Sequence, residues 1–463
     1  MKPSAYNFTW RTDDPSKVII FNSVTTALVE AAAQHIHLLE CPRIDYCALP
    51  PGARSFVDRL KPGGFVLDDA TDELQSLKFA VNATKYNSAN LRLAIAPTLR
   101  CNFACTYCYE QSADSAERRD GNHASMPAAV SHALLTFIAE RAKFVKGLSI
   151  NWFGGEPLLA KAIVLDLSQR MIRIAEDNGI DYFASMITNG YLLNRDPSLL
   201  GKLKESRISY FQITIDGPPP IHNARRRLKG GGPTFGPILE SVRLLARNEM
   251  KVGIRINVDR SNMQEALQLL DILEANGLKN VPVHLGCVTA QTSGCRSIEG
   301  SCATMMEFTT WNQRLAQRLE DGNFEAGPDV HYPRGVNVCV ANRLTSFIVD
   351  PDGDLYKCYS EIGEKRASIG NVIGFEGRGD KCRTREIRWI TWEPFSYPDC
   401  QSCKVLPICT GGCPYGPIAK GQQPTCAEWK YGLEQYVRAR YAREKARIES
   451  DPRGILTSDP ITA

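Results

Sequence analysis

Short apolar segments alternate with helix-length amphipathic stretches through the middle of this 463-residue chain. This alternation predicts a parallel sheet with right-handed crossovers, because neighbouring parallel strands need a long connection, which a helix usually supplies. The pattern fits both a doubly wound sheet and an open barrel. In both folds the functional residues lie beyond the carboxyl ends of the strands. The expected strands are residues 92–97, 148–153, 184–189, 208–215, 251–258 and 281–288.

Three cysteines directly follow the first expected strand, in the run CNFACTYCYE. Cys101, Cys105 and Cys108 have the spacing C-x3-C-x2-C and supply three thiolates, whereas a cubane iron–sulfur cluster normally takes four ligands from the protein. An iron without a protein ligand can bind a small molecule, just as a catalytic zinc keeps one position open. The alternative for these cysteines is a zinc knuckle with a distant fourth ligand.

This motif resembles that of the radical S-adenosylmethionine (SAM) superfamily, whose C-x-aromatic-C element matches Cys105-Thr106-Tyr107-Cys108. The resemblance implies an α/β fold with a partial (β/α)6 barrel, and a [4Fe–4S] cluster whose open iron is chelated by SAM. It also implies reductive cleavage of SAM to a 5′-deoxyadenosyl radical, chemistry that the cofactor carries while the protein orients and shields it. Tyr107 is expected near the adenine, and the alternative is an ordinary core aromatic.

Further polar motifs follow the other expected strands. Two glycines, as in Gly154-Gly155-Glu156-Pro157, let a backbone approach a ligand closely, and the proline can begin a helix. In the superfamily this motif holds the amino group of SAM, whereas elsewhere it is often only a turn. Arg255 and Asn257 in the fifth expected strand share one face, because side chains alternate along a strand. They are expected to contact SAM, and the alternative is a hydrogen-bond network inside the barrel. The expected SAM-binding residues are Tyr107, Gly154, Gly155, Glu156, Pro157, Thr188, Asn189, Asp216, Arg255 and Asn257.

A second group of cysteines extends from Cys339 to Cys426. Its spacing resembles the seven-cysteine SPASM domain of radical SAM enzymes that modify peptides and proteins, and this implies two auxiliary [4Fe–4S] clusters. In two-cluster ferredoxins a cysteine followed by proline ligates the other cluster, and Cys413-Pro414 ends the close-spaced run in the same way. A zinc ribbon at the C-x2-C pair is the alternative. The implied ligands are Cys400, Cys403, Cys409 and Cys426 for the outer cluster, and Cys339, Cys358 and Cys413 for the inner cluster.

The inner cluster has only three assigned thiolates. Sulfatase-maturating members of the superfamily carry a further cysteine just before the first SPASM cysteine, whereas residues 331–338 contain none. Cys382, between the halves of the SPASM motif, is the best candidate for a fourth ligand, although unassigned cysteines are more often small buried hydrophobes. The unassigned cysteines are Cys41, Cys47, Cys287, Cys295, Cys302 and Cys382.

The first ninety residues precede the barrel. Two expected strands followed by three expected helices suit a small winged-helix-like module. In radical SAM peptide maturases such a module resembles a recognition element for ribosomally synthesised, post-translationally modified peptides (RiPPs), which binds the precursor leader as an added strand at an exposed sheet edge. A structural cap over the open barrel is the alternative. The expected strands are residues 6–11 and 17–22, and the expected helices are 25–34, 53–60 and 70–84.

The composition of the chain argues against nucleic-acid-binding, secreted and membrane-spanning proteins. A net charge of +4 is too mild to indicate a nucleic-acid partner, and neither a signal h-region nor a membrane span is present. A soluble, cytoplasmic protein is expected. Sixteen cysteines in a large chain without a signal favour metal ligation over disulfides. The expected regions are 1–90 (recognition module), 91–310 (barrel), 311–337 (bridge), 338–440 (SPASM domain) and 441–463 (helix end and tail).

The leading hypothesis is an enzyme that abstracts hydrogen from a ribosomal precursor peptide and installs a thioether, carbon–carbon or related crosslink, with a flavodoxin or ferredoxin-type reductant. One alternative is a sulfatase-type maturase that forms formylglycine. Another is a non-catalytic electron carrier, although a pure carrier would ligate every iron. No catalytic acid or base is assigned; Asp216, Asp352 and Asp354 are candidates by position only. The sequence does not identify the peptide, the bond formed or the oligomeric state.

Overall fold

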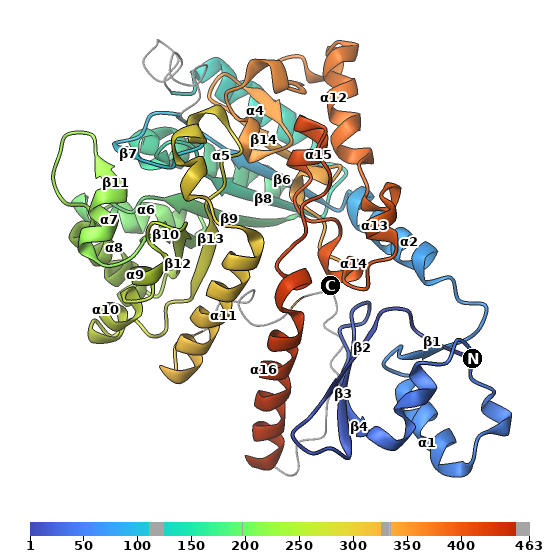
Figure 1. The fold of residues 1–463 in the computed structure, drawn as a ribbon. Helices are drawn as coiled ribbons and strands as arrows, with labels where there is room; N and C mark the ends of the chain where they lie inside the picture. Colours follow the sequence, from blue (N-terminus) through green and yellow to red (C-terminus); the bar gives the residue numbers. More distant parts are fainter. Residues whose placement is uncertain (111–124, 197, 326–332, 334, 451–463) are drawn as a thin grey trace.

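The computed structural model describes residues 1–110, 125–196, 198–325, 333 and 335–450. Part of the thiol-free stretch before Cys339, at residues 331, 332 and 334, lies outside the described residues, as does the expected tail at 451–463. Figure 1 shows a large sheet surrounded by helices, an N-terminal module to one side of it, and the C-terminal region between the two.

The centre of the molecule is a nine-stranded sheet with the order β13-β12-β10-β9-β8-β6-β14-β15-β16. The six strands of this sheet from β6 to β13 pair in parallel and follow one another in sequence order, so the order never reverses as it would in a doubly wound sheet. The six predicted strands and the partial barrel are therefore confirmed. These strands are β6 (Asn90–Ile95), β8 (Gly147–Trp152), β9 (Asp181–Thr188), β10 (Ile208–Thr214), β12 (Lys251–Val258) and β13 (Val283–Cys287).

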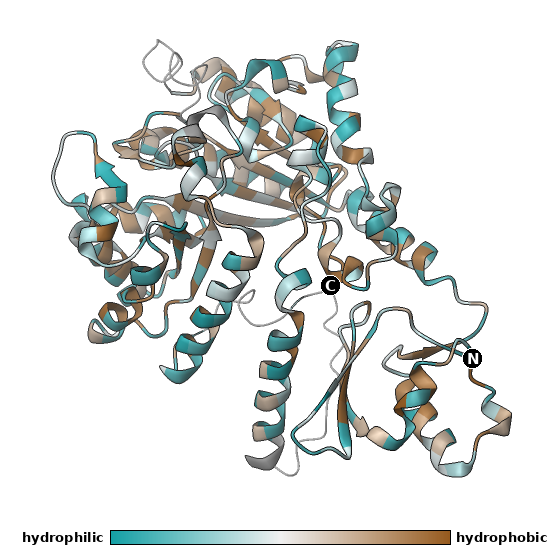
Figure 2. Cartoon of the chain, in the orientation of Figure 1, coloured by the Kyte–Doolittle hydropathy of each residue, from teal (hydrophilic) through white to brown (hydrophobic). Residues whose placement is uncertain are grey.

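Helices cover the outer face of this sheet. In α5 (Lys161–Asp177) the buried residues Val164, Leu167, Met171 and Ala175 recur every three or four positions, so one apolar stripe meets the strands. Full burial of each large side chain in such a stripe contributes about 1.5–3 kcal/mol. Figure 2 shows the central strands largely hydrophobic. The other covering helices are α4 (Ala128–Ala142), α6 (Leu199–Glu205), α8 (Phe235–Arg247), α10 (Leu269–Ala275) and α11 (Met305–Asp321).

The C-terminal region continues the same sheet. Strand β14 (Ser346–Val349) pairs in parallel with β6, and the Ala96 amide donates to the Val349 carbonyl oxygen at 2.9 Å. Strands β15 (Asp354–Tyr356) and β16 (Gly370–Asn371) follow in antiparallel pairing. The region that contains the second group of cysteines therefore begins with strands that extend the barrel sheet at its β6 edge. Beyond the sheet lie α12 (Asp380–Thr391), α13 (Pro398–Gln401), α14 (Leu406–Cys409), α15 (Tyr415–Lys420) and α16 (Trp429–Ser450).

The N-terminal module contains a three-stranded antiparallel sheet in the order β2-β3-β4. The helix predicted at residues 25–34 is wrong: residues 28–32 form β4, and a 3-10 helix, η1 (Ala33–Leu39), begins only afterwards. Alanine favours helix, but pairing with β3 outweighs this local preference. Because β3 lies at the centre of this sheet, its residues do not form the exposed edge to which a peptide strand could add, and the edge strands are β2 and β4. The other elements are β1 (Lys2–Pro3), β2 (Asn7–Arg11), β3 (Lys17–Asn22), β5 (Val66–Leu67), α1 (Pro51–Leu60) and α2 (Glu73–Tyr86).

This module is docked on the C-terminal region. One face of β3 packs towards α1 through Val18 and Ile20. The opposite face, with Ile19 and Phe21, packs in one cluster with residues of α14 and α16. Figure 1 shows α16 between α11 and the module. None of the helices among the described residues is both long and apolar enough to cross a membrane.

Candidate functional site

The first three cysteines lie on a loop at the carboxyl end of β6. Strand β7 (Phe103–Cys105) in this loop pairs with β11 (Arg226–Leu228), which fixes the loop against the rim of the barrel. Burial raises the pKa of Cys101 to about 12, and the neighbouring Cys105 thiolate contributes to the rise. Burial also raises the pKa of Cys108 well above its usual range, and the thiolates of Cys105 and Cys101 add to the effect. Three thiols that lie within electrostatic reach of one another are a donor set that suits an iron–sulfur cluster.

The two glycines after β8 pack against the backbone that enters the cysteine loop. A Cβ on Gly155 would lie 2.2 Å from the carbonyl oxygen of Arg100, and one on Gly154, where φ is +108°, would lie 2.6 Å from that of Thr98. The Gly155 amide donates to the Thr98 carbonyl at 3.2 Å, and the Glu156 amide to the Arg100 carbonyl at 2.8 Å. The missing side chains thus allow contact between two loops, a role that the sequence argument did not foresee. Pro157 then begins a short 3-10 helix, η3 (Pro157–Ala160).

Glu156 joins this loop to the end of β9. Its buried carboxylate accepts hydrogen bonds from the Leu158 amide (3.0 Å), the Thr188 hydroxyl (2.8 Å) and the Asn189 amide (2.8 Å). Burial raises the pKa of Glu156, and the three hydrogen bonds counteract part of the rise. Asn189 in turn donates to the Asn102 side chain at 2.7 Å and to Cys101 Sγ at 3.9 Å. Three of the expected SAM-binding residues therefore form one scaffold under the cysteine loop.

Tyr107 lies at the centre of a second network. Its hydroxyl donates to Asp216 at 2.5 Å and accepts from Arg226 Nη1 at 2.8 Å and Asn257 Nδ2 at 3.2 Å. Asp216 also accepts from the Asn257 amide at 3.0 Å, and Arg255 Nε donates to Asn257 Oδ1 at 2.8 Å. The structure thus contains the hydrogen-bond network that was the alternative for Arg255 and Asn257, while contact of these residues with SAM stays a prediction.

The sequence analysis missed the arginines of this network. Arg225 Nε lies 3.5 Å from Asp216, and its Nη1 donates to Asp259 at 2.9 Å. The run Arg225-Arg226-Arg227 was visible in the sequence, but nothing in it showed that two of the three are buried. Asp216 is fully buried and both its oxygens accept hydrogen bonds, so its geometry suits positioning of Tyr107 and does not suit a general base.

The electrostatic neighbours of the second group of cysteines divide into two sets. Burial raises the pKa of Cys358, and the thiolates of Cys339 and Cys413 raise it further. Burial likewise raises the pKa of Cys400, where the nearby thiolates are those of Cys409, Cys403 and Cys426. These sets have the same members as the inner and outer ligand sets that the resemblance implied, and ligation of clusters by them stays a prediction.

Cys382 is the sequence-based candidate for a fourth ligand of the inner cluster. It belongs to the first turn of α12, and its thiol accepts from Arg385 Nη1 at 4.0 Å. The structure therefore gives no support to Cys382 as the fourth inner ligand.

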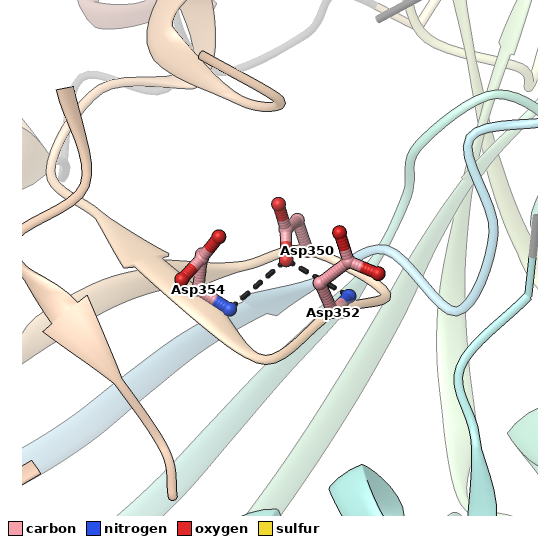
Figure 3. Close-up of side chains that lie close together, drawn as sticks. All are labelled: Asp350, Asp352 and Asp354. Atoms are coloured by element: carbon pink, nitrogen blue, oxygen red, sulfur yellow. Dashed lines mark hydrogen bonds between the residues drawn. The ribbon is translucent and has the colours of Figure 1, made fainter. Parts of the chain in front are cut away.

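Asp352 lies in the turn between β14 and β15, and Asp354 is the first residue of β15 (Figure 3). The neighbouring Asp350 accepts the amides of Asp352 (3.0 Å) and Asp354 (2.9 Å) and the Tyr356 hydroxyl (3.0 Å). Ligand atoms of the three carboxylates lie within 4.8 Å of one another. The hydrogen bonds of Asp350 stabilise the turn, and Asp354 accepts a hydrogen bond from Asn371 at 3.0 Å. This geometry does not identify Asp352 or Asp354 as a catalytic base.

Residues 95–273 match the family model of the radical SAM superfamily. The serine-type anaerobic sulfatase-maturating enzyme of Klebsiella aerogenes is 24% identical over 349 residues, which are 70% of this chain and 80% of that enzyme. The cysteine-type enzyme of Clostridium perfringens (strain 13 / Type A) is 22% identical over 327 residues, 68% of this chain and 85% of that enzyme.

Two solved structures share the fold. Native anSMEcpe with bound AdoMet and Cp18Cys peptide has a TM-score of 0.58 at 18% identity, and the match covers 76% of this chain and 99% of that one. Streptococcus suis SuiB bound to precursor peptide SuiA has a TM-score of 0.51 at 15% identity, with 92% and 98% covered. The second match extends over more of this chain than the first.

Proposed function

This chain is a radical SAM enzyme of the type that includes anaerobic sulfatase maturases and RiPP-modifying enzymes, and we propose that it crosslinks a ribosomal precursor peptide. It uses SAM, a SAM-binding [4Fe–4S] cluster and auxiliary clusters. At Cys101, Cys105 and Cys108 such a cluster would supply the electron that splits SAM into methionine and a 5′-deoxyadenosyl radical. The product is a thioether, carbon–carbon or related crosslink, and a flavodoxin or ferredoxin-type protein supplies electrons.

The residues around Cys101, Cys105 and Cys108 hold the cysteine loop in place. Glu156 binds the loop after β8 to the end of β9, and Asn189 reaches from there to Cys101. Tyr107 and Asp216 tie the loop's second half to the ends of β10 and β12. These contacts favour a rigid cysteine loop, as a site requires when it must position a substrate and exclude water.

The single observation that favours a precursor peptide is that β4 ends its sheet, with no further strand paired to it among the described residues. The Asn22 amide donates to the Ala27 carbonyl at 3.0 Å and the Ala33 amide to the Ser16 carbonyl at 2.8 Å. In an antiparallel pair, residues that bond to the partner strand alternate with residues whose amide and carbonyl groups face away from it. Glu30 and Ala32 are of the second kind, so their amides point outward from the edge of the sheet. A cavity of about 530 Å³ lies beside them, lined in part by Lys17, Glu30 and Arg59. An extended leader could add here as a fourth strand.

Ala32 offers a sharp test of leader binding. Its φ is −67°, the value that proline requires, so Ala32→Pro removes an outward amide without straining the backbone. Loss of one hydrogen bond, about 1 kcal/mol, predicts roughly five-fold weaker binding of a fluorescent leader peptide by anisotropy, or more if the proline ring also blocks pairing. Ala32→Val keeps the amide and serves as the control. Equal affinity in all three proteins would exclude this edge as the leader site.

Co-expression with the peptide encoded beside the gene tests the reaction. A peptide that loses hydrogen and whose fragments remain joined in tandem mass spectrometry indicates a crosslink. Replacing Cys101, Cys105 and Cys108 by alanine should abolish SAM cleavage and remove about four irons per chain. Undiminished SAM cleavage in this variant, or zinc in place of iron, would contradict the proposal.

Formylglycine formation is the second candidate, favoured by the similarity to both serine-type and cysteine-type sulfatase-maturating enzymes. A sulfatase-derived peptide with a target serine or cysteine distinguishes the two. An aldehyde trapped by a hydrazide reagent on that peptide, with no change in the leader-bearing peptide, would favour the sulfatase-type reaction over the crosslink.

A further inference from the structure

The segment that follows β13 contacts both groups of cysteines. Gln291 Nε2 lies 3.8 Å from Cys413 Sγ in the inner set. The next residue, Thr292, donates its hydroxyl to the Tyr109 carbonyl at 3.0 Å, and Cys295 Sγ donates to the Tyr107 carbonyl at 3.6 Å. Tyr107 and Tyr109 flank Cys108, so a few residues at the barrel rim join the SAM-cluster loop to the inner set.

The chemistry of the partners fixes the orientation of the Gln291 amide. A ligating thiolate can only accept a hydrogen bond, so the amide nitrogen must face Cys413. The amide oxygen then accepts the Ser360 hydroxyl, at 3.1 Å. Ser360 lies two residues after Cys358, so both ends of the amide meet segments that carry inner-set cysteines.

We propose that Gln291 is a positioning residue for the inner auxiliary cluster and raises the reduction potential of that cluster. This inference rests on the proposed ligand set of Cys339, Cys358 and Cys413. Reduction adds negative charge to the cluster and its thiolates, so a hydrogen bond to a ligating sulfur stabilises the reduced state. No bond is made or broken in this role. Thr292 anchors the same segment to the SAM-cluster loop, so movement of that loop changes the Gln291 contact as well.

The test is a redox titration followed by electron paramagnetic resonance. It uses the full chain with Cys101, Cys105 and Cys108 replaced by alanine, so that the spectra report only the auxiliary clusters. In Gln291→Leu the ratio of oxidised to reduced inner cluster at a fixed applied potential should rise about ten-fold, which for one electron is a shift of about 59 mV to lower potential. Gln169→Leu is the matched control, because Gln169 lies in α5, one of the helices on the outer face of the sheet, and donates to the Glu205 carbonyl at the end of α6.

Two further variants keep the inference testable if Gln291→Leu loses iron. Gln291→Glu keeps the size of the side chain but presents a carboxylate to the sulfur, so it should lower the potential at least as far. Ser360→Ala removes the group that orients the amide and should give a smaller shift in the same direction. Unchanged potentials in variants that retain iron, or equal shifts of both auxiliary signals, would overturn the role of Gln291. Absence of any auxiliary signal before mutation would instead refute the proposed ligand set.

Discussion

An alanine at position 155 would place its Cβ 2.2 Å from the carbonyl oxygen of Arg100 and 2.5 Å from that of Leu99. Ordinary van der Waals contact begins near 3.4 Å, so one of the two loops must move by roughly 1 Å. Both neighbours are backbone atoms, which cannot rotate away as a flexible side chain would. Gly155→Ala should therefore displace the chain that leads into Cys101.

The magnitude follows from what this movement breaks. Crowding of a packed region costs about 1–3 kcal/mol. The movement also weakens the Gly155 and Glu156 amide bonds to Thr98 and Arg100, each worth about 1 kcal/mol. A total of about 2–4 kcal/mol corresponds to a thirty-fold or greater loss of chains with the cysteine loop correctly placed. We expect fewer irons at the SAM cluster and weaker SAM binding, while the auxiliary clusters persist.

Iron content per chain and SAM affinity by calorimetry measure both effects. Gly201→Ala is the control, because its Cβ would have no neighbour within 4 Å and it lies in helix α6, where alanine is favourable. If Gly155→Ala binds iron and SAM as well as Gly201→Ala does, the close approach of the two loops is not required. The reasoning from loop packing would then be refuted.

Two further predictions concern the network around Tyr107. Asp216→Asn removes the charge that faces Arg225 and should lower the free energy of unfolding by about 2–3 kcal/mol; an unchanged denaturant midpoint would contradict this. Burial, followed by the nearby charge of Arg226, lowers the pKa of His222 to about 3. The unfolded chain takes up a proton below pH 6.5 and the folded chain does not, so this residue reduces stability as pH falls from 6.5 towards 3. His222→Gln should lessen the loss of stability between pH 6.5 and 5.5 by about 1 kcal/mol, and denaturation curves with the same pH dependence as wild type would show otherwise.

The sequence predicted the parallel strands well because their apolar runs are long and separated by amphipathic helices. It did not predict β4, since alanine-rich residues 28–32 favour helix locally and become a strand only through pairing with Lys17–Asn22. The division of the cysteines into two ligand sets came from the resemblance of their spacing to the SPASM domain, and cluster ligation by these sets stays a prediction. The Tyr107–Arg226 contact was not, because these residues are 119 positions apart and meet only after β7 pairs with β11.

The parallel pairing of β14 with β6 makes one continuous ladder of backbone hydrogen bonds out of the barrel and the region that carries the inner cysteines. Neighbouring strands are held about 4.8 Å apart, and a ladder of this kind has no hinge. The strand that leads into the SAM-cluster loop and the strand that lies between Cys339 and Cys358 therefore keep a fixed spacing. A substrate peptide would therefore meet a barrel and an auxiliary region that share one sheet, and any adjustment to the peptide would come from the loops beyond the ends of the strands.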